Sequence, residues 1–548
     1  MDGQTSLRKA HPQRFSVGLV VLIFAALHVV FALFLYLDLR HGARHAPGLS
    51  LADFWNALDG SAGQARMAGT TISRAYNVLV SMVLTSIALA IPLTANMYTP
   101  KLIDIFIKDR VNIAVLAFFV FSSAQAIWST QATWDQGPLR DYGGVYPRVS
   151  LWVAFETITL GWAILIPYFY YVFRFLNPTN IIERVSGLVT DTLQHIPRGE
   201  DKDAIAAAQR ELEQRILHLG NVILRAVDRA DRDVTLDAVR ALKRVLILYQ
   251  YEKDSLPDLW FRASADLFVG LSNEAIDVIR GERIWVEHKC LHQLALAYNA
   301  SLAKMQDAIS AISDVTREIV LNAESQADLG AVRLGIRFFN TFIREAVKRK
   351  DAHAIFDVLQ QYKELAHDLF PSHPELVLEI VRHVKYYADF ARLSGLTFIY
   401  ELAAYDVESI LEWAYQRDSA TRRDVLEVLL SFDAVPASAR LAKARAIAGG
   451  FFHERGLGTE EALVRQGLAP VPPAVVQQAL SDILATKDPV FWEVTDRQVN
   501  IDFVDDTRKR AIERFLVGLI PTPLDGPARA EPGPPASSAS ARRYAAGG

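Results

Sequence analysis

Two ionisable side chains lie inside the long apolar runs of this sequence, and they have the clearest potential for chemistry. His28 lies near the middle of the first run, and Glu156 lies about two turns into the fourth. A charge in hydrocarbon is costly, so each is a functional candidate by default. If the two runs are neighbours, the imidazole and the carboxylate can pair or relay a proton. The alternative is a packing role, with a neutral, hydrogen-bonded His28 and a Glu156 that caps a helix or faces outward.

A second polar set follows one helical face. Asn77, Ser81 and Thr85 recur at four-residue intervals in the second run, which places them on one side of a helix. The third run adds four polar residues, Ser122, Ser123, Gln125 and Ser129. Together they can form a water-exposed path for an ion or a small solute. Small and hydroxyl side chains also allow close helix packing, which is the simpler interpretation.

The rest of the chain offers no signature of catalysis. It contains no phosphate loop ending in Gly-Lys-Ser or Gly-Lys-Thr, no nucleophile elbow and no His-Glu-x-x-His motif. His288 and His292 stand one helical turn apart, with Glu287 and Cys290 beside them. This spacing resembles a metal site, but it arises often by chance, and a polar, solvated helix face explains it better. We therefore expect no enzyme, no metal site and no cofactor.

The elements that position these residues are four apolar runs, at about residues 15–37, 75–97, 111–130 and 150–173. Each is long enough to cross the roughly 30 Å hydrocarbon layer as a helix. The first run exceeds the core of a secretory signal peptide and lacks a small-residue cleavage pattern, so we expect a retained anchor. The sequence predicts a transmembrane domain over residues 1–178 with four spans.

Basic residues in the connections predict the orientation. Lys101, Lys108 and Arg110 crowd the link between the second and third runs, whereas the next link holds Arg140 and Arg148. The positive-inside rule then places both termini in the cytoplasm.

From about residue 180 the apolar residues follow the helical period over nearly the whole sequence. We therefore expect an all-α fold with a cytosolic domain over residues 179–520. Ala226-Val227-Asp228-Arg229 and Ala346-Val347-Lys348-Arg349 each lead to an aspartate, Asp231 and Asp351, that opens the next apolar helix. Stacked helical hairpins of unequal length fit this pattern better than a regular solenoid. The proline-rich tail over residues 521–548 should be disordered.

The composition of the chain restricts the classes of partner that it can bind. A net charge of -4, with Lys and Arg interspersed among Asp and Glu, argues against a nucleic-acid partner. The single cysteine, Cys290, excludes an intrachain disulfide and is compatible with a reducing cytosol.

The link between the second and third runs reads Met-Tyr-Thr-Pro-Lys-Leu-Ile-Asp-Ile-Phe-Ile-Lys-Asp-Arg-Val-Asn from Met97 to Asn112. It resembles the "Tyr-Ser-Pro-Arg-Leu, Phe, Arg-Asp-Arg-Val" link of an uncharacterised family of predicted bacterial inner-membrane proteins, over about residues 74–130. Thr99 and Lys101 stand where the pattern has Ser and Arg. The matching positions are Tyr98, Pro100, Leu102, Phe106, Asp109, Arg110 and Val111. The resemblance implies a location and an architecture, and no reaction.

The same link has a physical interpretation. Leu102, Ile103, Phe106 and Ile107 share one helical face. Either a short helix lies at the cytoplasmic interface, or the link extends the two spans toward the soluble domain. We keep Tyr98, Pro100, Lys101, Asp109 and Arg110 as a candidate interfacial motif.

Two functions remain. In the first, the spans anchor a cytosolic helical domain that binds an unknown protein partner, as a scaffold or regulatory protein without catalysis. In the second, the spans assemble as a homo-oligomer around the polar stripe and pass ions or small solutes. The first needs fewer assumptions, because transporters usually show discontinuous spans or repeated halves.

Overall fold

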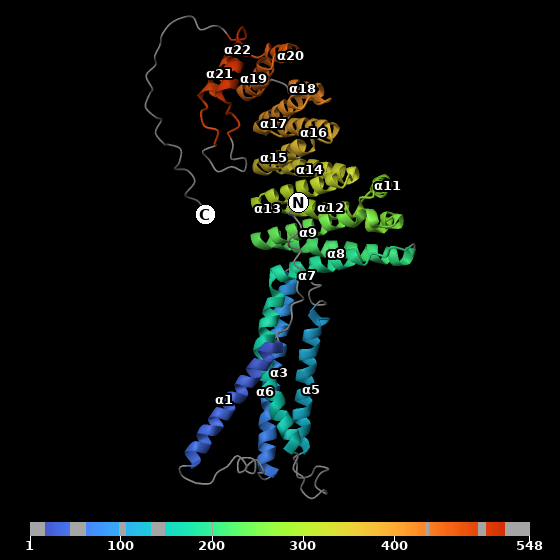
Figure 1. Cartoon of the computed structure of the whole chain (residues 1–548), viewed down its shortest axis with the longest axis vertical. Coiled ribbons are helices and arrows are strands. Elements are labelled where there is room, and N and C mark those ends of the chain that lie inside the picture. Colours follow the sequence, from blue (N-terminus) through green and yellow to red (C-terminus); the bar gives the residue numbers. More distant parts are fainter. Residues whose placement is uncertain are drawn as a thin grey trace. The chain divides into compact units, whose positions relative to one another are not determined.

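The computed structural model describes residues 17–43, 62–97, 106–132, 148–199, 201–432, 438–490 and 500–520. These ranges are almost entirely helical and contain no β-strand, which confirms the all-α prediction (Figure 1). In chain order the α-helices are α1 (Val17–Ala43), α3 (Ala62–Met97), α5 (Arg110–Ala132), α6 (Arg148–Leu176), α7 (Pro178–Gln194), α8 (Lys202–Asp228), α9 (Arg232–Glu252), α10 (Asp258–Phe261), α11 (Asn273–Gly281), α12 (Trp285–Ser301), α13 (Gln306–Ser325), α14 (Leu329–Arg349), α15 (Ala352–Leu369), α16 (Pro374–Leu393), α17 (Thr397–Gln416), α18 (Arg422–Leu430), α19 (Ala439–Glu454), α20 (Gly458–Leu468), α21 (Pro473–Ala485) and α22 (Asp506–Leu516).

The apolar runs form a bundle in which α3, α5 and α6 pack against one another, and α1 packs on α6. Residues four and three apart on each helix supply the core, so the buried stripe follows the helical period. Its members include Tyr76, Leu79, Val83, Phe119, Tyr168 and Tyr171.

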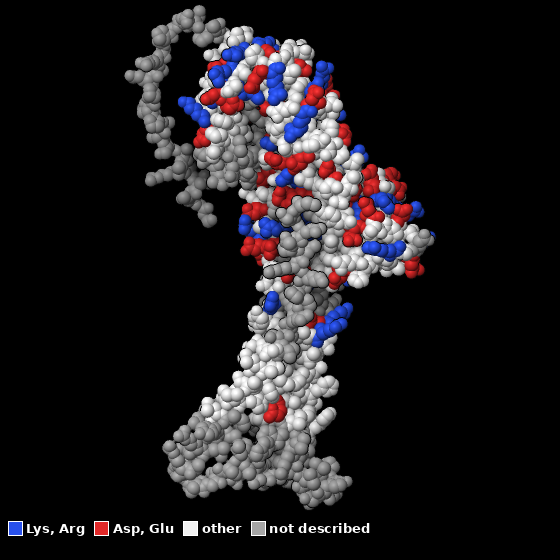
Figure 2. Space-filling model, viewed as in Figure 1, with Lys and Arg blue, Asp and Glu red and all other residues white. Residues whose placement is uncertain are grey.

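Three helices of the bundle are long and apolar enough to cross a membrane, rather than the four that the sequence predicts. The candidate spans are Met67–Ala88, Arg110–Trp128 and Val153–Arg174. In α1 the qualifying apolar stretch, Gly18–Val30, is shorter. Figure 2 shows that the surface of this part is nearly free of Lys, Arg, Asp and Glu, in contrast to the helices that follow.

After the bundle, helices stack in two layers. α8 packs on α12 and α12 on α14, while α9 packs on α13, and the hairpin partners α8 with α9 and α13 with α14 join the layers. α15 continues the second layer, because its Gln361 and Asp368 bond to Arg317 of α13. This is the arrangement of stacked helical hairpins that the sequence predicts.

Three hairpin turns share one design, in which a residue with positive φ precedes an aspartate. The pairs are Ala230–Asp231, Ala327–Asp328 and Lys350–Asp351. Each aspartate side chain accepts a hydrogen bond from a backbone N–H in the first turn of the next helix. The backbone N–H of the same aspartate closes the preceding helix, for example by donating to the carbonyl oxygen of Ala226. The predicted capping roles of Asp231 and Asp351 are confirmed, and Asp328 is a third case.

The chain divides into two compact units, Met1–Asp368 and Leu369–Gly548. The predicted domain boundary at residue 178 lies inside the first unit, in the break between α6 and α7. In the second unit α19 is the central helix and packs on α17, α20, α21 and α22. The predicted tail over residues 521–548 lies outside the described residues.

Candidate functional site

The structure brings His28 and Glu156 together. The two residues lie on α1 and α6, the helices that pack against each other at the edge of the bundle. Nε2 of His28 lies 3.0 Å from Oε2 of Glu156, and Nδ1 lies 2.9 Å from the carbonyl oxygen of Phe24. Both side chains stay partly exposed, at 36% and 44%. The contact that the sequence analysis gave as possible is present, between side chains that are both partly exposed.

The two bonds of His28 fix how protons are placed. A carbonyl oxygen can only accept, so Nδ1 carries a proton, and Nε2 of the neutral ring presents a lone pair to Glu156. A hydrogen bond between Nε2 and Oε2 then needs one proton between them, on either the ring or the carboxyl group. The arrangement can hold a proton and transfer it between the two side chains.

The polar stripe of the second run does not face the bundle core. Tyr76, Leu79 and Val83 are buried and fix the inward face of α3. A helix turns about 100° per residue, so the next positions along rotate outward. The stripe of Asn77, Ser81 and Thr85 is exposed at all three residues.

In the third run, Ser122 is buried in the bundle, and its hydroxyl lies near that of Tyr76, which also lies near Thr157. Ser123 and Gln125 are partly buried, and the Ser129 side chain lies outside the described residues. Ser122 therefore does not share the outer face of α3 with Asn77, Ser81 and Thr85. Large side chains such as Phe119 and Tyr168 fill the bundle interior.

The candidate interfacial motif is described in part, since Tyr98, Pro100 and Lys101 lie outside the described residues. Asp109 precedes α5, and its Oδ1 accepts hydrogen bonds from the backbone N–H of Val111 and of Asn112. The same oxygen accepts a bond of 2.7 Å from the Tyr171 hydroxyl of α6.

Asn112 adds a second bond at this place, because its buried side-chain amide donates to the carbonyl oxygen of Phe106. Asp109 therefore caps the third run and ties it to the fourth, a role that its position before an apolar run could have indicated. The first residue of α5, Arg110, is exposed.

A buried charged cluster, which the sequence analysis missed, lies in the layered helices. Nζ of Lys253 lies 2.7 Å from Oε1 of Glu287 and also bonds to Asp328. Burial raises the pKa of Glu287 to about 7, against the opposing effect of Lys253. The two carboxylates raise the pKa of Lys253, although burial lowers it. The cluster joins the end of α9, the helix α12 and the cap of α14.

The metal-like set on α12 forms only in part the solvated face that the sequence predicts, since His292 is exposed and His288 is half-buried. Glu287 and Cys290 are fully buried. The rings of His288 and His292 stack at 6.1 Å, and burial lowers the pKa of His288 to about 4. Within the described ranges, no three His, Cys, Asp or Glu side chains lie close enough to hold a metal ion. Packing between helices explains why Glu287 and Cys290 are buried, because α12 is covered by α8, α13 and α14.

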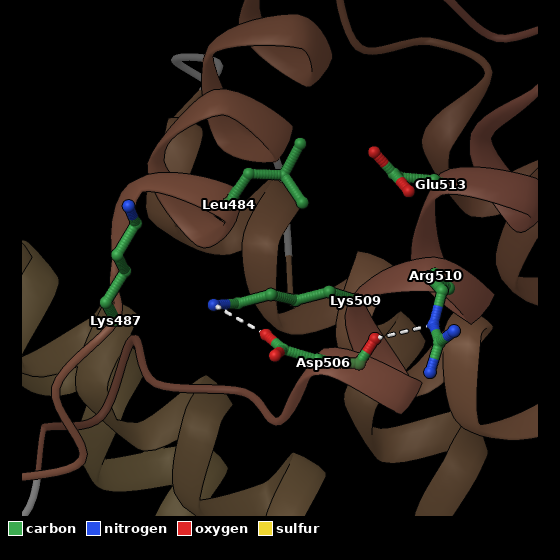
Figure 3. Close-up of a pocket in the computed structure, with 6 residues that line it drawn as sticks. All are labelled: Leu484, Lys487, Asp506, Lys509, Arg510 and Glu513. Carbon is green, nitrogen blue, oxygen red and sulfur yellow. Dashed lines mark hydrogen bonds and ion pairs between the residues drawn. The ribbon is translucent and has the colours of Figure 1, made fainter.

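The second unit carries a polar surface cavity of ≈ 670 Å³ beside α22 (Figure 3). Lys509 donates to the carbonyl oxygen of Thr486 and lies 3.8 Å from Asp506. Arg510 donates to the backbone oxygen of Asp506. The lining residues are Leu484, Lys487, Asp506, Lys509, Arg510 and Glu513. Cations and carboxylates alternate there, so the cavity has no concentrated charge of one sign.

No curated protein and no solved structure matches the chain. The family resemblance that the sequence analysis found over residues 74–130 is confirmed. The matched region also includes all four apolar runs, α7 and α8. Residues 14–230 match the model of a family described as a predicted membrane protein (DUF2254), whose function is unknown.

Proposed function

We propose that this protein is a multi-pass anchor of the bacterial inner membrane that holds a helical interaction domain at the cytoplasmic face, as a scaffold or regulatory protein without catalysis. The observation that carries this proposal is the continuity between α6 and the layered helices. A single residue, Asn177, separates α6 from α7, and α7 packs on both α8 and α9. The last span thus leads directly into the first hairpin of the array.

Stacked helical hairpins suit a binding role. Each hairpin contacts its neighbours, so the array presents extended surfaces that no single hairpin would hold in place. In the described residues of this array, several polar groups act in helix capping and in bonds between helices. These contacts hold the stacked hairpins together, so that the array can present a surface to a partner.

We propose that α1 is the fourth span. It has 27 residues, which at 1.5 Å per residue makes about 40 Å and exceeds the hydrocarbon layer. Its contact with α6 through His28 and Glu156 supports a place beside the other spans. Four crossings put both termini on the same side, and the basic residues of the links favour the cytoplasmic side.

The outward stripe on α3 supports a homo-oligomer. An exposed amide such as Asn77 has no partner in lipid, whereas the same residue of a second copy supplies one. A pore through one bundle is disfavoured, because large side chains fill its interior. A solute path would have to run between copies, along Asn77, Ser81 and Thr85.

Two measurements on the full-length protein test this. Ion flux in reconstituted vesicles should be absent, and the mass in detergent should exceed that of a monomer. The triple variant with Leu at residues 77, 81 and 85 should shift the mass toward the monomer. A control with Leu at Val78 and Met82, which are also exposed on α3, should not. If the unmodified protein passes ions and the triple variant does not, the protein is a channel and the scaffold proposal is wrong.

The partner is tested on the array itself. Photo-reactive residues at exposed array positions should crosslink to one protein in cells, and that protein, once purified, should bind vesicles that hold the full chain. Crosslinks that spread evenly over unrelated proteins, with no rebinding, would contradict the scaffold.

A further inference from the structure

A groove of ≈ 550 Å³ lies at the corner where α6 ends and α7 begins. Its lining residues come from the last two turns of α6, the linking residue and the first turn of α7, and they are Tyr170, Phe173, Arg174, Asn177, Thr179 and Asn180. The candidate span Val153–Arg174 ends in this groove. With this helix crossing the membrane, as the proposed function has it, the groove lies where the chain leaves the hydrocarbon layer.

The groove is rigid at its polar end. The side-chain amide of Asn180 donates to the carbonyl oxygen of Arg174 at 2.7 Å, which closes the corner across the break between the helices. Oδ1 of Asn177 accepts from the backbone N–H of Thr179 at 3.0 Å. These bonds hold the Thr179 hydroxyl and the Asn177 amide group at the rim of the groove.

Arg174 supplies a positive charge without a carboxylate. Its side chain is exposed, and none of the described acidic residues forms an ion pair with it. A neighbouring arginine differs, since Arg184 of α7 reaches the Tyr171 hydroxyl that Asp109 also binds. The Arg174 guanidinium is thus available to an anion, and its planar donors match phosphate oxygens.

Two aromatic rings form the apolar side of the groove. Tyr170 is 64% exposed and Phe173 is 69% exposed. Exposed rings at the end of a span are favoured where headgroups meet acyl chains. A ligand that fits both sides of the groove has an anionic head and an apolar body.

We propose that this groove binds an anionic phospholipid, with the headgroup phosphate on Arg174 and the upper acyl chain against Tyr170 and Phe173. Asn177 and Thr179 add hydrogen bonds to the phosphate or to the ester region. The bound lipid fixes the corner between the last span and α7, so it sets how the layered helices meet the membrane.

Native mass spectrometry of the full-length protein tests the proposal by titration with phosphatidylglycerol and phosphatidylcholine of identical acyl chains. The protein should retain phosphatidylglycerol at least fivefold more strongly. Arg174→Gln should abolish this preference and Arg174→Lys should keep most of it, since Lys retains the charge. The matched control Arg74→Gln, at an exposed arginine of α3, should behave as the unmodified protein.

Phe173→Ala should weaken retention of both lipids without changing their ratio, because it removes apolar contact alone. Equal retention of the two lipids by the unmodified protein, or an unchanged preference in a folded Arg174→Gln protein, would overturn the proposal. Inorganic phosphate serves as the competitor. If it displaces phosphatidylglycerol at equal concentration, the groove binds a free phosphate group, and the lipid assignment is wrong.

Discussion

His28 of α1 and Glu156 of α6 hold one proton between them across 3.0 Å. The proton is required because Nδ1 of the ring already donates to the carbonyl oxygen of Phe24. Loss of that proton leaves two lone pairs facing each other. The docking of α1 on α6 therefore includes a hydrogen bond that needs a proton on one of the two side chains.

The first prediction concerns this docking. His28→Ala should loosen α1, so that a cysteine placed at the buried Val20 reacts faster with a lipid-soluble maleimide in a Cys290→Ala background. We expect roughly a tenfold increase, since a hydrogen bond to a charged group contributes about 1.5 kcal/mol and 1.4 kcal/mol is a factor of ten.

Glu156→Gln gives the matched test, because an amide can donate to the lone pair of Nε2 without a shared proton. At a fixed pH, the reaction rate at residue 20 in Glu156→Gln should stay close to that of the unmodified protein and below that of His28→Ala. A cysteine at Val21, which is 59% exposed, should react at the same rate in every background. Equal rates at residue 20 in all variants would show that the pair does not hold α1.

The sequence predicts the helices well and the direction of single side chains poorly. The apolar runs specify α1, α3, α5 and α6, because length and hydropathy act over many residues at once. The four-residue spacing of Asn77, Ser81 and Thr85 correctly indicates one face. Which face it is depends on where the neighbouring helices lie, and the larger residues Tyr76 and Leu79 decide it.

Long-range ion pairs could not be predicted from the sequence for the same reason. Lys253, Glu287 and Asp328 come from three separate elements, and no spacing links them. The capping aspartates could be predicted, since a cap acts on the residues next to it in the chain.

The second prediction concerns the buried charged cluster. Lys253→Met should lower the free energy of unfolding by about 3–5 kcal/mol, since it leaves two carboxylates without their cation. Nζ of Lys253 is 2.7 Å from Oε1 of Glu287, and the Glu287 side chain is fully buried. The double variant Lys253→Met/Glu287→Leu should recover part of the loss.

The thiol of Cys290 reports this unfolding, because it is fully buried one turn from Glu287 and burial raises its pKa. Its labelling in urea should begin at a lower concentration in Lys253→Met. The control Lys243→Met removes the more exposed pair with Glu318 and should change the free energy by about 1 kcal/mol or less. Similar effects at residues 243 and 253 would contradict the prediction.

The third prediction concerns the stability of the fold at acidic pH. Burial lowers the pKa of His288 to about 4, from 6.5 in the unfolded chain, so the unfolded state binds the proton first as pH falls. The stabilisation by a neutral His288 is therefore complete above pH 6.5 and is lost as pH falls toward about 4. The effect should be about 3 kcal/mol. Glu287 acts in the opposite direction, because its raised pKa weakens the fold as pH rises from 4.5 toward about 7.

His288→Phe separates the two effects. The new ring would lie beside Phe268 and Phe338, which already contact the imidazole edge to face, and Glu287 stays in both proteins. The difference in unfolding free energy between variant and unmodified protein should grow in favour of the variant between pH 6.5 and 4. Curves that remain parallel over that range would assign the acid response to other groups.

The fourth prediction concerns the close contact of α19 with α22. A Cβ at Gly450 would lie 2.4 Å from Cγ1 of Ile512 and 3.1 Å from its backbone nitrogen, so α22 has to move to accept it. Gly to Ala in a helix otherwise gains up to about 1 kcal/mol. Because a backbone atom blocks the site, we expect the overpacking cost of about 1–3 kcal/mol to exceed that gain.

Hydrogen exchange measures this locally. In Gly450→Ala, amides of α19 and α22 should exchange roughly tenfold faster, since 1.4 kcal/mol of lost protection is a factor of ten. Amides of α12, in the other unit, should not change. The control Gly458→Ala meets no atom within 4 Å and should leave α19 protected. If Gly450→Ala instead slows exchange, α22 yields to the methyl group at little cost, and the packing of α19 is looser than these distances require.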